Sequence, residues 1–295
     1  MKKVVIFVLF LNFVFSSKCP AGSFLLPFML TCHRYLDCND IKSIRIVKEL
    51  NSGFVKTVYL AKWKHYNVVL MKPNRFGFDD DFKTGLSMLK LMNPNDRVTQ
   101  LIGYCEERNI ILTEYHMNGD ARNVLALMEK NSSVDTIENR LKLCINYAEL
   151  LQMLHSGPYG TRVACDSNTL QKLLSQFLVT SDLKLIVNDV DALPQVQPNS
   201  SIVCGSRRLA GDFVAPEQKS TSVIGYNEKT DIWKAASVCQ YFIEGHKDSQ
   251  IVLYSIYEMH KQCKNRDPNL RPSADELVDG YKRVLYDLIA SRSEL

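Results

Sequence analysis

The sequence predicts an α+β protein of two lobes, in which a sheet-rich lobe precedes a mainly helical one. Three observations support this class. Five short segments rich in apolar residues fall within residues 44–115, and the first alternates apolar and polar side chains as a strand does. A polar stretch at residues 117–120 then interrupts the pattern. Beyond it, apolar residues between Leu141 and Leu154 recur at helical spacing.

The first lobe, residues 43–116, is expected to hold a five-stranded antiparallel sheet and one helix. Alternation over residues 44–50 predicts a half-buried strand that ends in a turn at residues 51–53. Four more strands are expected at residues 55–61, 67–71, 98–104 and 110–115. Apolar residues spaced three apart predict a helix over residues 82–92.

The second lobe, residues 117–293, is expected to be mainly helical. Its first long helix carries an apolar stripe and ends near His155. Two short strands are expected to follow, at residues 177–179 and 184–187, and a loop then leads into the helical remainder.

Length and charge limit the classes of function. The chain has 295 residues, enough for two lobes with a substantial core. Its formal net charge of +4 is too small to indicate a nucleic-acid partner. Hydrophobic residues at 46% and charged residues at 23% are ordinary for a globular protein.

The N-terminus predicts entry into the secretory pathway. Lys2 and Lys3 precede an apolar run over residues 4–15, which is shorter than the roughly 20 residues of a membrane span. We therefore interpret residues 1–17 as a signal peptide, cleaved after Ser16, or as a short signal-anchor. Both alternatives deliver the rest of the chain to an oxidising lumen.

The cysteines agree with that compartment. Three of the nine fall within residues 18–42, and we interpret this segment as a lumenal stem held by disulfides. They are Cys19, Cys32 and Cys38. An odd total leaves at least one thiol unpaired, and the spacing does not define the pairing. Asn131 and Asn199 begin acceptor sequons, so both are expected to be glycosylated.

Three motifs in the second lobe occur in the order typical of a protein kinase. Ala215-Pro216-Glu217 resembles the end of an activation segment, and Asp231 and Arg271 follow at suitable distances. Glu217 and Arg271 are expected to form a buried ion pair. Asp231 is expected to accept N–H groups of the catalytic loop at the start of a central helix. The predicted class is therefore the bilobal protein-kinase-like fold.

The phosphate-binding positions depart from the usual kinase pattern. The loop around Gly53 keeps only one glycine, and Met71 stands where a third-strand lysine is expected. Lys56, on the adjacent strand, is the replacement that we favour, as in the with-no-lysine kinases. Lys72 is the alternative, but neighbouring residues of a strand face opposite sides, so Lys72 is expected to point out of the cleft.

A carboxylate from the nearby helix is expected to orient Lys56. Asp80 and Asp81 are the acids near that helix, and the sequence does not decide between them.

The catalytic loop also departs from the pattern. Asp166 is the acid expected to face the acceptor hydroxyl, although no His-Arg precedes it. Gln176, ten residues later, is the expected magnesium ligand, which implies an insertion in this loop. Asp189 is the expected second ligand. Asp191 is interpreted as a turn-forming acid, with a further metal ligand as the alternative. Because Cys165 replaces the arginine that reads an activation-loop phosphate, activity is expected to need no such phosphorylation.

These unusual motifs resemble those of the protein O-mannose kinases. The matching stretches are residues 112–116, 160–163, 165–168, 175–178, 188–194 and 211–217. The resemblance covers the chain from about Cys19 to its C-terminus.

The resemblance implies a lumenal enzyme of the endoplasmic reticulum, normally anchored as a single-pass type II membrane protein and expected to be a monomer. It would use ATP with Mg²⁺ or Mn²⁺ to phosphorylate the 6-hydroxyl of mannose in an O-linked GalNAc-GlcNAc-Man trisaccharide, as on α-dystroglycan. Asp166 and Lys56 would be catalytic, and Gln176 and Asp189 would bind the metal. The implied nucleotide contacts are Gly53, Lys56, Val58, Val69, Glu114 and His116.

Two other functions fit the same sequence less well. A pseudokinase would keep the ion-pair framework but has no need for Lys56, Asp166 and Asp189 together. An ordinary cytosolic kinase would not carry the apolar N-terminus and the nearby cysteines.

Overall fold

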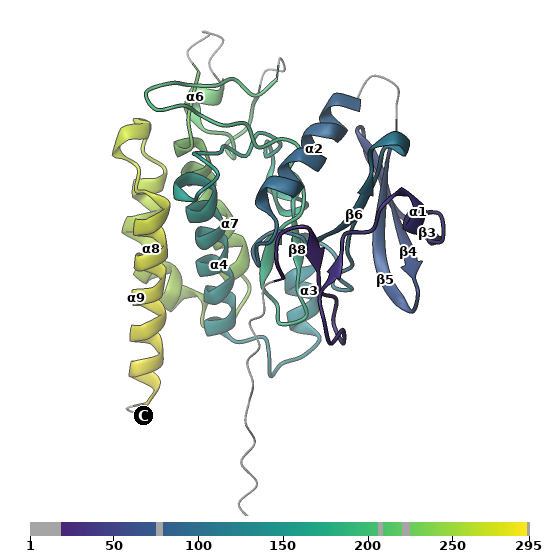
Figure 1. Ribbon diagram of the computed structural model, residues 1–295. Coiled ribbons are helices and arrows are strands. Elements are labelled where there is room, and N and C mark those ends of the chain that lie inside the picture. Colours follow the sequence, from purple (N-terminus) through teal and green to yellow (C-terminus); the bar gives the residue numbers. More distant parts are fainter. Residues whose placement is uncertain (1–18, 75–78, 206–208, 220–224, 294–295) are drawn as a thin grey trace, which may run out of the picture.

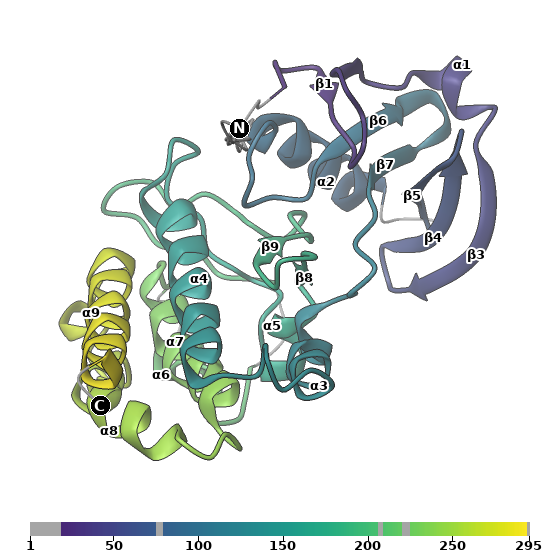
Figure 2. The same ribbon diagram turned by 90° about the horizontal axis from the view of Figure 1, so that it is seen from below.

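The computed structural model describes residues 19–74, 79–205, 209–219 and 225–293. It has the two expected lobes, a sheet and a group of helices joined by the segment after β7 (Figure 2). The predicted signal peptide or anchor at residues 1–17 lies outside the described residues. Within the described ranges, no helix is both long and apolar enough to cross a membrane.

The first lobe is a five-stranded sheet in the order β3-β4-β5-β7-β6, and every neighbouring pair is antiparallel. The prediction of five antiparallel strands is confirmed. Its strands are β3 (Arg45–Ser52), β4 (Lys56–Trp63), β5 (Tyr66–Pro73), β6 (Leu101–Cys105) and β7 (Ile110–Glu114). The short helix η1 (Glu106–Arg108) joins β6 to β7. Residue 98, expected inside the fourth strand, instead pairs with Val187 of the other lobe.

The first strand differs from its prediction. All eight residues of β3 are exposed, so the expectation of a half-buried strand is wrong. β3 lies at the edge of the sheet, and among the described strands it pairs only with β4, with two register irregularities. Alternation of apolar and polar residues predicts a strand, but it does not tell whether anything packs on that strand. At the edge of a sheet both faces can stay open to water.

The two faces of this sheet serve different purposes. Val58 pairs with Met71, and both contact the core shared with the second lobe. Ala61 pairs with Val68 on the opposite face, in a separate apolar cluster. Helix α2 (Asp79–Met92) packs into the shared core and begins three residues before its predicted start. The first face is therefore the one that meets the cleft between the lobes.

The segment expected as a stem packs against the sheet. Its elements are β1 (Ser23–Phe24), β2 (His33–Arg34) and α1 (Cys38–Ile41), and they lie beside β6 in both views (Figures 1 and 2). Disulfides join Cys19 to Cys32 within the segment and Cys38 to Cys105 of β6. Leu36 lies so close to Gly103 that a Cβ on Gly103 would fall 2.4 Å from the Leu36 carbonyl oxygen. The segment is thus part of the first lobe.

The second lobe is built around one central helix. This helix, α4 (Ile137–Ser156), packs against α7 (Lys229–Ile243) and α9 (Ala274–Ser293), and α8 (Ser249–Cys263) flanks the last two. The Cys144–Cys239 disulfide joins α4 to α7. The remaining elements are η2 (Ala121–Asn123), α3 (Val124–Glu129), α5 (Leu170–Leu174), β8 (Phe177–Val179), β9 (Leu185–Val187), α6 (Pro216–Lys219) and η3 (Pro268–Leu270).

Candidate active site

A buried ion pair holds the end of the activation segment to the helical lobe. The guanidinium of Arg271 donates to both carboxylate oxygens of Glu217, at 2.6 and 2.8 Å. It also donates to the backbone carbonyls of Asn265 and Lys229. Arg271 is 3% exposed, and each of its three guanidinium nitrogens donates at least one of these hydrogen bonds. The ion pair expected from the sequence is present.

Asp231 holds the backbone of the catalytic loop by a hydrogen bond. This buried residue lies at the start of α7, and its Oδ2 accepts the backbone N–H of Ala164 at 3.0 Å. The same oxygen lies 3.4 Å from Nε2 of His155. Asp231 therefore fixes the backbone just before Asp166, as its position in the sequence predicted.

Lys234 is a further support that sequence analysis missed. It is 1% exposed and donates to Oγ of Ser167 at 2.6 Å, while its Nζ lies 3.6 Å from Asp231 Oδ1. Ser167 follows Asp166 directly, so the lysine holds the loop on the far side of the candidate base. A lysine three residues after Asp231 on one helix is a weak signal, because most such pairs are exposed.

Lys56 crosses the cleft to reach two acids of the second lobe. Its Nζ lies 2.5 Å from Asp189 Oδ1 and 2.9 Å from Asp191 Oδ2. In the β4–β5 register, Val58 pairs with Met71, so Lys56 shares the cleft-facing side with Met71. Lys72 pairs with Thr57 on the other side.

The expected partners of Lys56 need a correction. Asp80 and Asp81 are exposed at the start of α2, and the acids that contact Lys56 are Asp189 and Asp191. Asp191 is also more than a turn-forming residue, because its side chain is only 12% exposed and paired with the lysine. The sequence alone could not identify the acids that pair with Lys56, because they lie 133 and 135 residues further along the chain.

Burial and charge act together on this triad. Burial alone would lower the pKa of Lys56, but the carboxylates of Asp189 and Asp191 outweigh it and the pKa is raised. Burial and the neighbouring Asp189 raise the pKa of Asp191 to about 6, against the opposing effect of Lys56. Burial opposes ionisation of Asp189 as well, yet Lys56 keeps its pKa below the ordinary value. Lys56 and Asp189 therefore form a charged pair in the cleft.

Three of the four residues expected to carry the chemistry lie around one small cavity. Asp166, Gln176 and Asp189 all line it, together with apolar side chains from α4, β8 and β9. The insertion between Asp166 and Gln176 forms the short helix α5. The side-chain amide nitrogen of Gln176 donates to the backbone carbonyl of Lys172 at 3.0 Å and to the hydroxyl of Ser175 at 3.2 Å. The structure thus brings together residues that lie 23 positions apart.

This cavity offers the donor atoms that a magnesium ion accepts. Asp189 supplies a carboxylate and Gln176 a side-chain amide, both hard oxygen ligands. The backbone N–H of Asp189 donates to the carbonyl of Gln176 at 3.3 Å, which holds the two residues side by side. The residues present therefore fit a divalent cation bound together with nucleotide phosphates.

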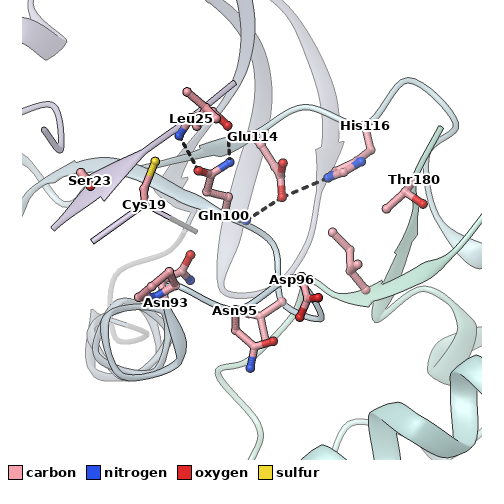
Figure 3. Close-up of a pocket in the computed structure, with 13 residues that line it drawn as sticks. Cys19, Ser23, Leu25, Asn93, Asn95, Asp96, Gln100, Glu114, His116 and Thr180 are labelled. Carbon is pink, nitrogen blue, oxygen red and sulfur yellow. Dashed lines mark hydrogen bonds and ion pairs between the residues drawn. The ribbon is translucent and has the colours of Figure 1, made fainter. Parts of the chain in front are cut away.

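The residues expected to contact the nucleotide fall into two groups. Val58 and Val69 lie on the cleft-facing side of β4 and β5, and Gly53 sits in the tight turn between β3 and β4, where its N–H donates to the carbonyl of Lys56. Glu114 and His116 differ, because their side chains line a separate cavity of about 280 Å³ at the segment joining the lobes (Figure 3).

In that second cavity Glu114 forms a local network. Its Oε1 accepts the backbone N–H of Gln100 at 2.7 Å and lies 3.2 Å from Nε2 of His116. Gln100 in turn exchanges two hydrogen bonds with the backbone of Leu25. Glu114 is thus linked through Gln100 to the N-terminal segment, and this network lies away from the cavity that Asp189 lines.

The residue before Asp166 has a role that the sequence did not indicate. Cys165 forms a disulfide with Cys204, which lies between Asp189 and Glu217. The backbone N–H of Cys204 also donates to the hydroxyl of Tyr226 at 2.7 Å. A covalent bond therefore ties the activation segment to the catalytic loop, where other kinases place an arginine.

Comparisons with known proteins show which family the chain resembles. Residues 44–245 match the family described as Protein tyrosine and serine/threonine kinase. The chain is 42% identical to Protein O-mannose kinase of Gallus gallus over 92% of its own length and 81% of that protein. It is 38% identical to Protein O-mannose kinase of Homo sapiens, over 91% of this chain and 81% of that protein. Protein O-mannose kinase of Xenopus laevis is 39% identical, with coverage of 90% and 80%.

Proposed function

The chain belongs to the protein kinases and, among them, to the protein O-mannose kinases, and we propose that its acceptor is the 6-hydroxyl of an O-linked mannose. The mannose would be presented in a GalNAc-GlcNAc-Man trisaccharide on glycoproteins such as α-dystroglycan. The observation that carries a phosphotransferase function is the contact between Lys56 and Asp189 across the cleft. It supplies a fixed cation at a site that has lost the usual lysine.

In this proposal each polar group of the cleft has one task. Asp166 orients the sugar hydroxyl and accepts its proton. Lys56 would contact the phosphates of ATP from the first lobe, and Gln176 and Asp189 would hold Mg²⁺ or Mn²⁺. The metal supplies positive charge that neutralises the phosphates. Because phosphoryl transfer depends mostly on position and charge, this arrangement needs no covalent intermediate.

We further propose that the protein works in the lumen of the endoplasmic reticulum, as a monomer. Four disulfides among the described residues support an oxidising compartment. Asn131 and Asn199 are exposed in turns, which suits glycosylation. Attachment as a type II membrane protein and release after signal cleavage are the two arrangements proposed for the N-terminus.

The decisive experiment offers two acceptors to the purified protein. Residues 19–295 would be incubated with ATP and Mg²⁺ together with the mannose-terminated trisaccharide or with a generic protein substrate. We expect phosphate on the mannose 6-hydroxyl only, and loss of transfer in Asp166→Asn. Asp182→Asn is the matched control, because Asp182 is an exposed acid that is paired with a lysine as Asp166 is. Transfer to the protein substrate alone would refute the proposed acceptor.

A further inference from the structure

The turn between β1 and β2 holds two large apolar side chains out in solvent. Phe28 is 97% exposed and Leu30 is 99% exposed, the highest values among the large apolar residues that the structure describes. The turn belongs to the purple loop that follows β1 in Figure 1. One exposed apolar side chain is ordinary, but two that are almost fully exposed in one short turn suggest a contact with another apolar surface.

The backbone of this turn strengthens the case. The N–H of Met29 donates to the carbonyl of Leu26 at 3.0 Å, which closes a β-turn with Pro27 and Phe28 at its centre. Phe28 has a φ of 70°, a conformation that normally selects glycine or asparagine at this place in a turn. A bulky aromatic residue in a strained position, where it also contributes no burial, points to a purpose other than folding.

The loop that carries the turn is braced by the rest of the first lobe. Met29, between the two exposed residues, packs against the apolar cluster on the sheet face opposite the cleft. Phe24 and Leu26 are buried members of the same cluster. The Cys19–Cys32 disulfide closes the segment around the turn. Phe28 and Leu30 are therefore presented by a fixed loop.

The sequence around the turn carries no ionised side chain of the usual kinds. Residues 20–33 contain no aspartate, glutamate, lysine or arginine. A surface that binds another protein usually has a polar or charged rim around its apolar centre. A surface that enters lipid avoids charged groups, because each of them is costly to move into a bilayer. The composition of this segment therefore favours lipid as the partner.

The place of the turn in the chain also favours a membrane. The apolar run over residues 4–15, interpreted above as a signal peptide or a short anchor, ends just before Cys19. The Cys19–Cys32 disulfide brings that end of the chain to the loop. An anchor in the bilayer would thus keep the loop at a high effective concentration near the lipid surface. Two apolar side chains bind a membrane weakly by themselves, so they would add to an anchor.

We propose that Phe28 and Leu30 insert into the lumenal surface of the membrane that holds the N-terminal anchor. Met29 packs on the sheet face opposite the cleft, so the docked protein turns its cleft away from the lipid. This orientation leaves the cleft open to glycoproteins in the lumen. The proposal rests on the proposed membrane attachment of the N-terminus and does not depend on the phosphate acceptor.

Quenching of tryptophan by brominated lipid tests the contact. The full chain would be incorporated into phosphatidylcholine vesicles with bromine on the upper part of the acyl chains, and the vesicles would be isolated by flotation. In Phe28→Trp, the added emission should be lost relative to unbrominated vesicles. Leu270→Trp is the matched control and should keep its emission, because Leu270 is an exposed apolar residue of the second lobe. The wild type gives the background of Trp63 and Trp233.

Other occupants of the turn would give different signals. A blue shift of the Phe28→Trp emission without quenching would mean that a protein surface or a second copy of the chain covers the turn, and it would overturn the proposal. Equal emission in brominated and unbrominated vesicles without any shift would also overturn it. So would a full chain that does not float with the vesicles, because the apolar run and the turn together would then not hold the membrane.

A second variant separates docking from folding and catalysis. Asparagine tolerates the backbone conformation at position 28, so Phe28→Asn should melt at the temperature of the wild type or higher. Its kcat with a soluble acceptor should equal that of the wild type. A lower melting temperature would show that Phe28 serves the fold and would overturn the proposal. Failure of the mannose acceptor would leave the vesicle result intact, because quenching requires no kinase reaction.

Discussion

The ion-pair framework of the second lobe keeps the usual kinase residues, whereas the cleft between the lobes does not. Glu217, Asp231 and Arg271 occupy the positions expected of a kinase and make the expected contacts. In the cleft, Met71 occupies the position where kinases usually carry a lysine, and Lys56 from another strand supplies the positive charge instead. A buried ion pair is compensated on all sides and cannot move without leaving a charge unpaired. A charge facing an open cleft can come from any element that reaches the same point.

The sharpest way to break this comparison is to move the lysine back. Lys56→Met should lower kcat by at least about 10³-fold, because the phosphates lose their fixed cation. Adding Met71→Lys should restore part of the rate, since both positions face the cleft on neighbouring strands. Nucleotide binding and kcat would be measured for the single and double variants. No recovery in the double variant would mean that the contact with Asp189 and Asp191 depends on strand position as well as charge.

Substitutions in the framework of Glu217, Asp231 and Arg271 should change the stability of the protein more than its catalytic rate. Arg271→Met leaves the carboxylate of Glu217, whose side chain is 18% exposed, without its partner, and we expect a loss of about 3 kcal/mol in the free energy of unfolding. Chemical denaturation measures it. Glu217→Gln with Arg271→Met removes both charges and should cost less than the single change. A single variant as stable as the wild type would show that water already compensates the pair.

Low pH should also lower the stability of the helical second lobe. Burial, followed by the charge of Lys264, lowers the pKa of His260 from 6.5 to about 4, and its Nε2 lies 2.9 Å from the hydroxyl of Tyr281. The unfolded chain therefore takes up the proton first, so this stability is complete above pH 6.5 and is lost as the pH falls toward 4. The loss should reach about 3 kcal/mol.

Unfolding curves between pH 4 and 7 would detect it. His260→Gln keeps a polar group near Tyr281 and should flatten the dependence. The same slope in wild type and variant would assign the effect to other groups.

The smallest expected effect concerns phosphorylation. Because the Cys165–Cys204 disulfide ties the activation segment to the catalytic loop, phosphatase treatment should leave kcat unchanged within about twofold. Changing both cysteines to serine frees the segment and should lower kcat with little change in KM for ATP. A large fall after phosphatase treatment of the wild type would show that a phosphate, in addition to the disulfide, orders the segment.

Sequence reasoning succeeded where one residue and its neighbours determine the outcome. The absence of a lysine at position 71 predicted that a nearby strand supplies the cation. Turn residues and the distribution of apolar residues predicted the five strands. It failed where distant segments meet. The pairing of Lys56 with Asp191 and the support from Lys234 depend on tertiary contacts. The exposure of β3 depends on which strand lies at the edge, which alternation cannot reveal.

The disulfides set an order for making this protein. In a chain that enters an oxidising compartment N-terminus first, Cys19 and Cys32 are 13 residues apart and can join early. Cys38 must wait for Cys105, and Cys144 must wait for Cys239, 95 residues later. A chain trimmed to residues 44–245 would leave Cys105 without its partner and uncover one face of the sheet. A unit that keeps all four described disulfides must therefore include Cys19, well before the region that carries the chemistry.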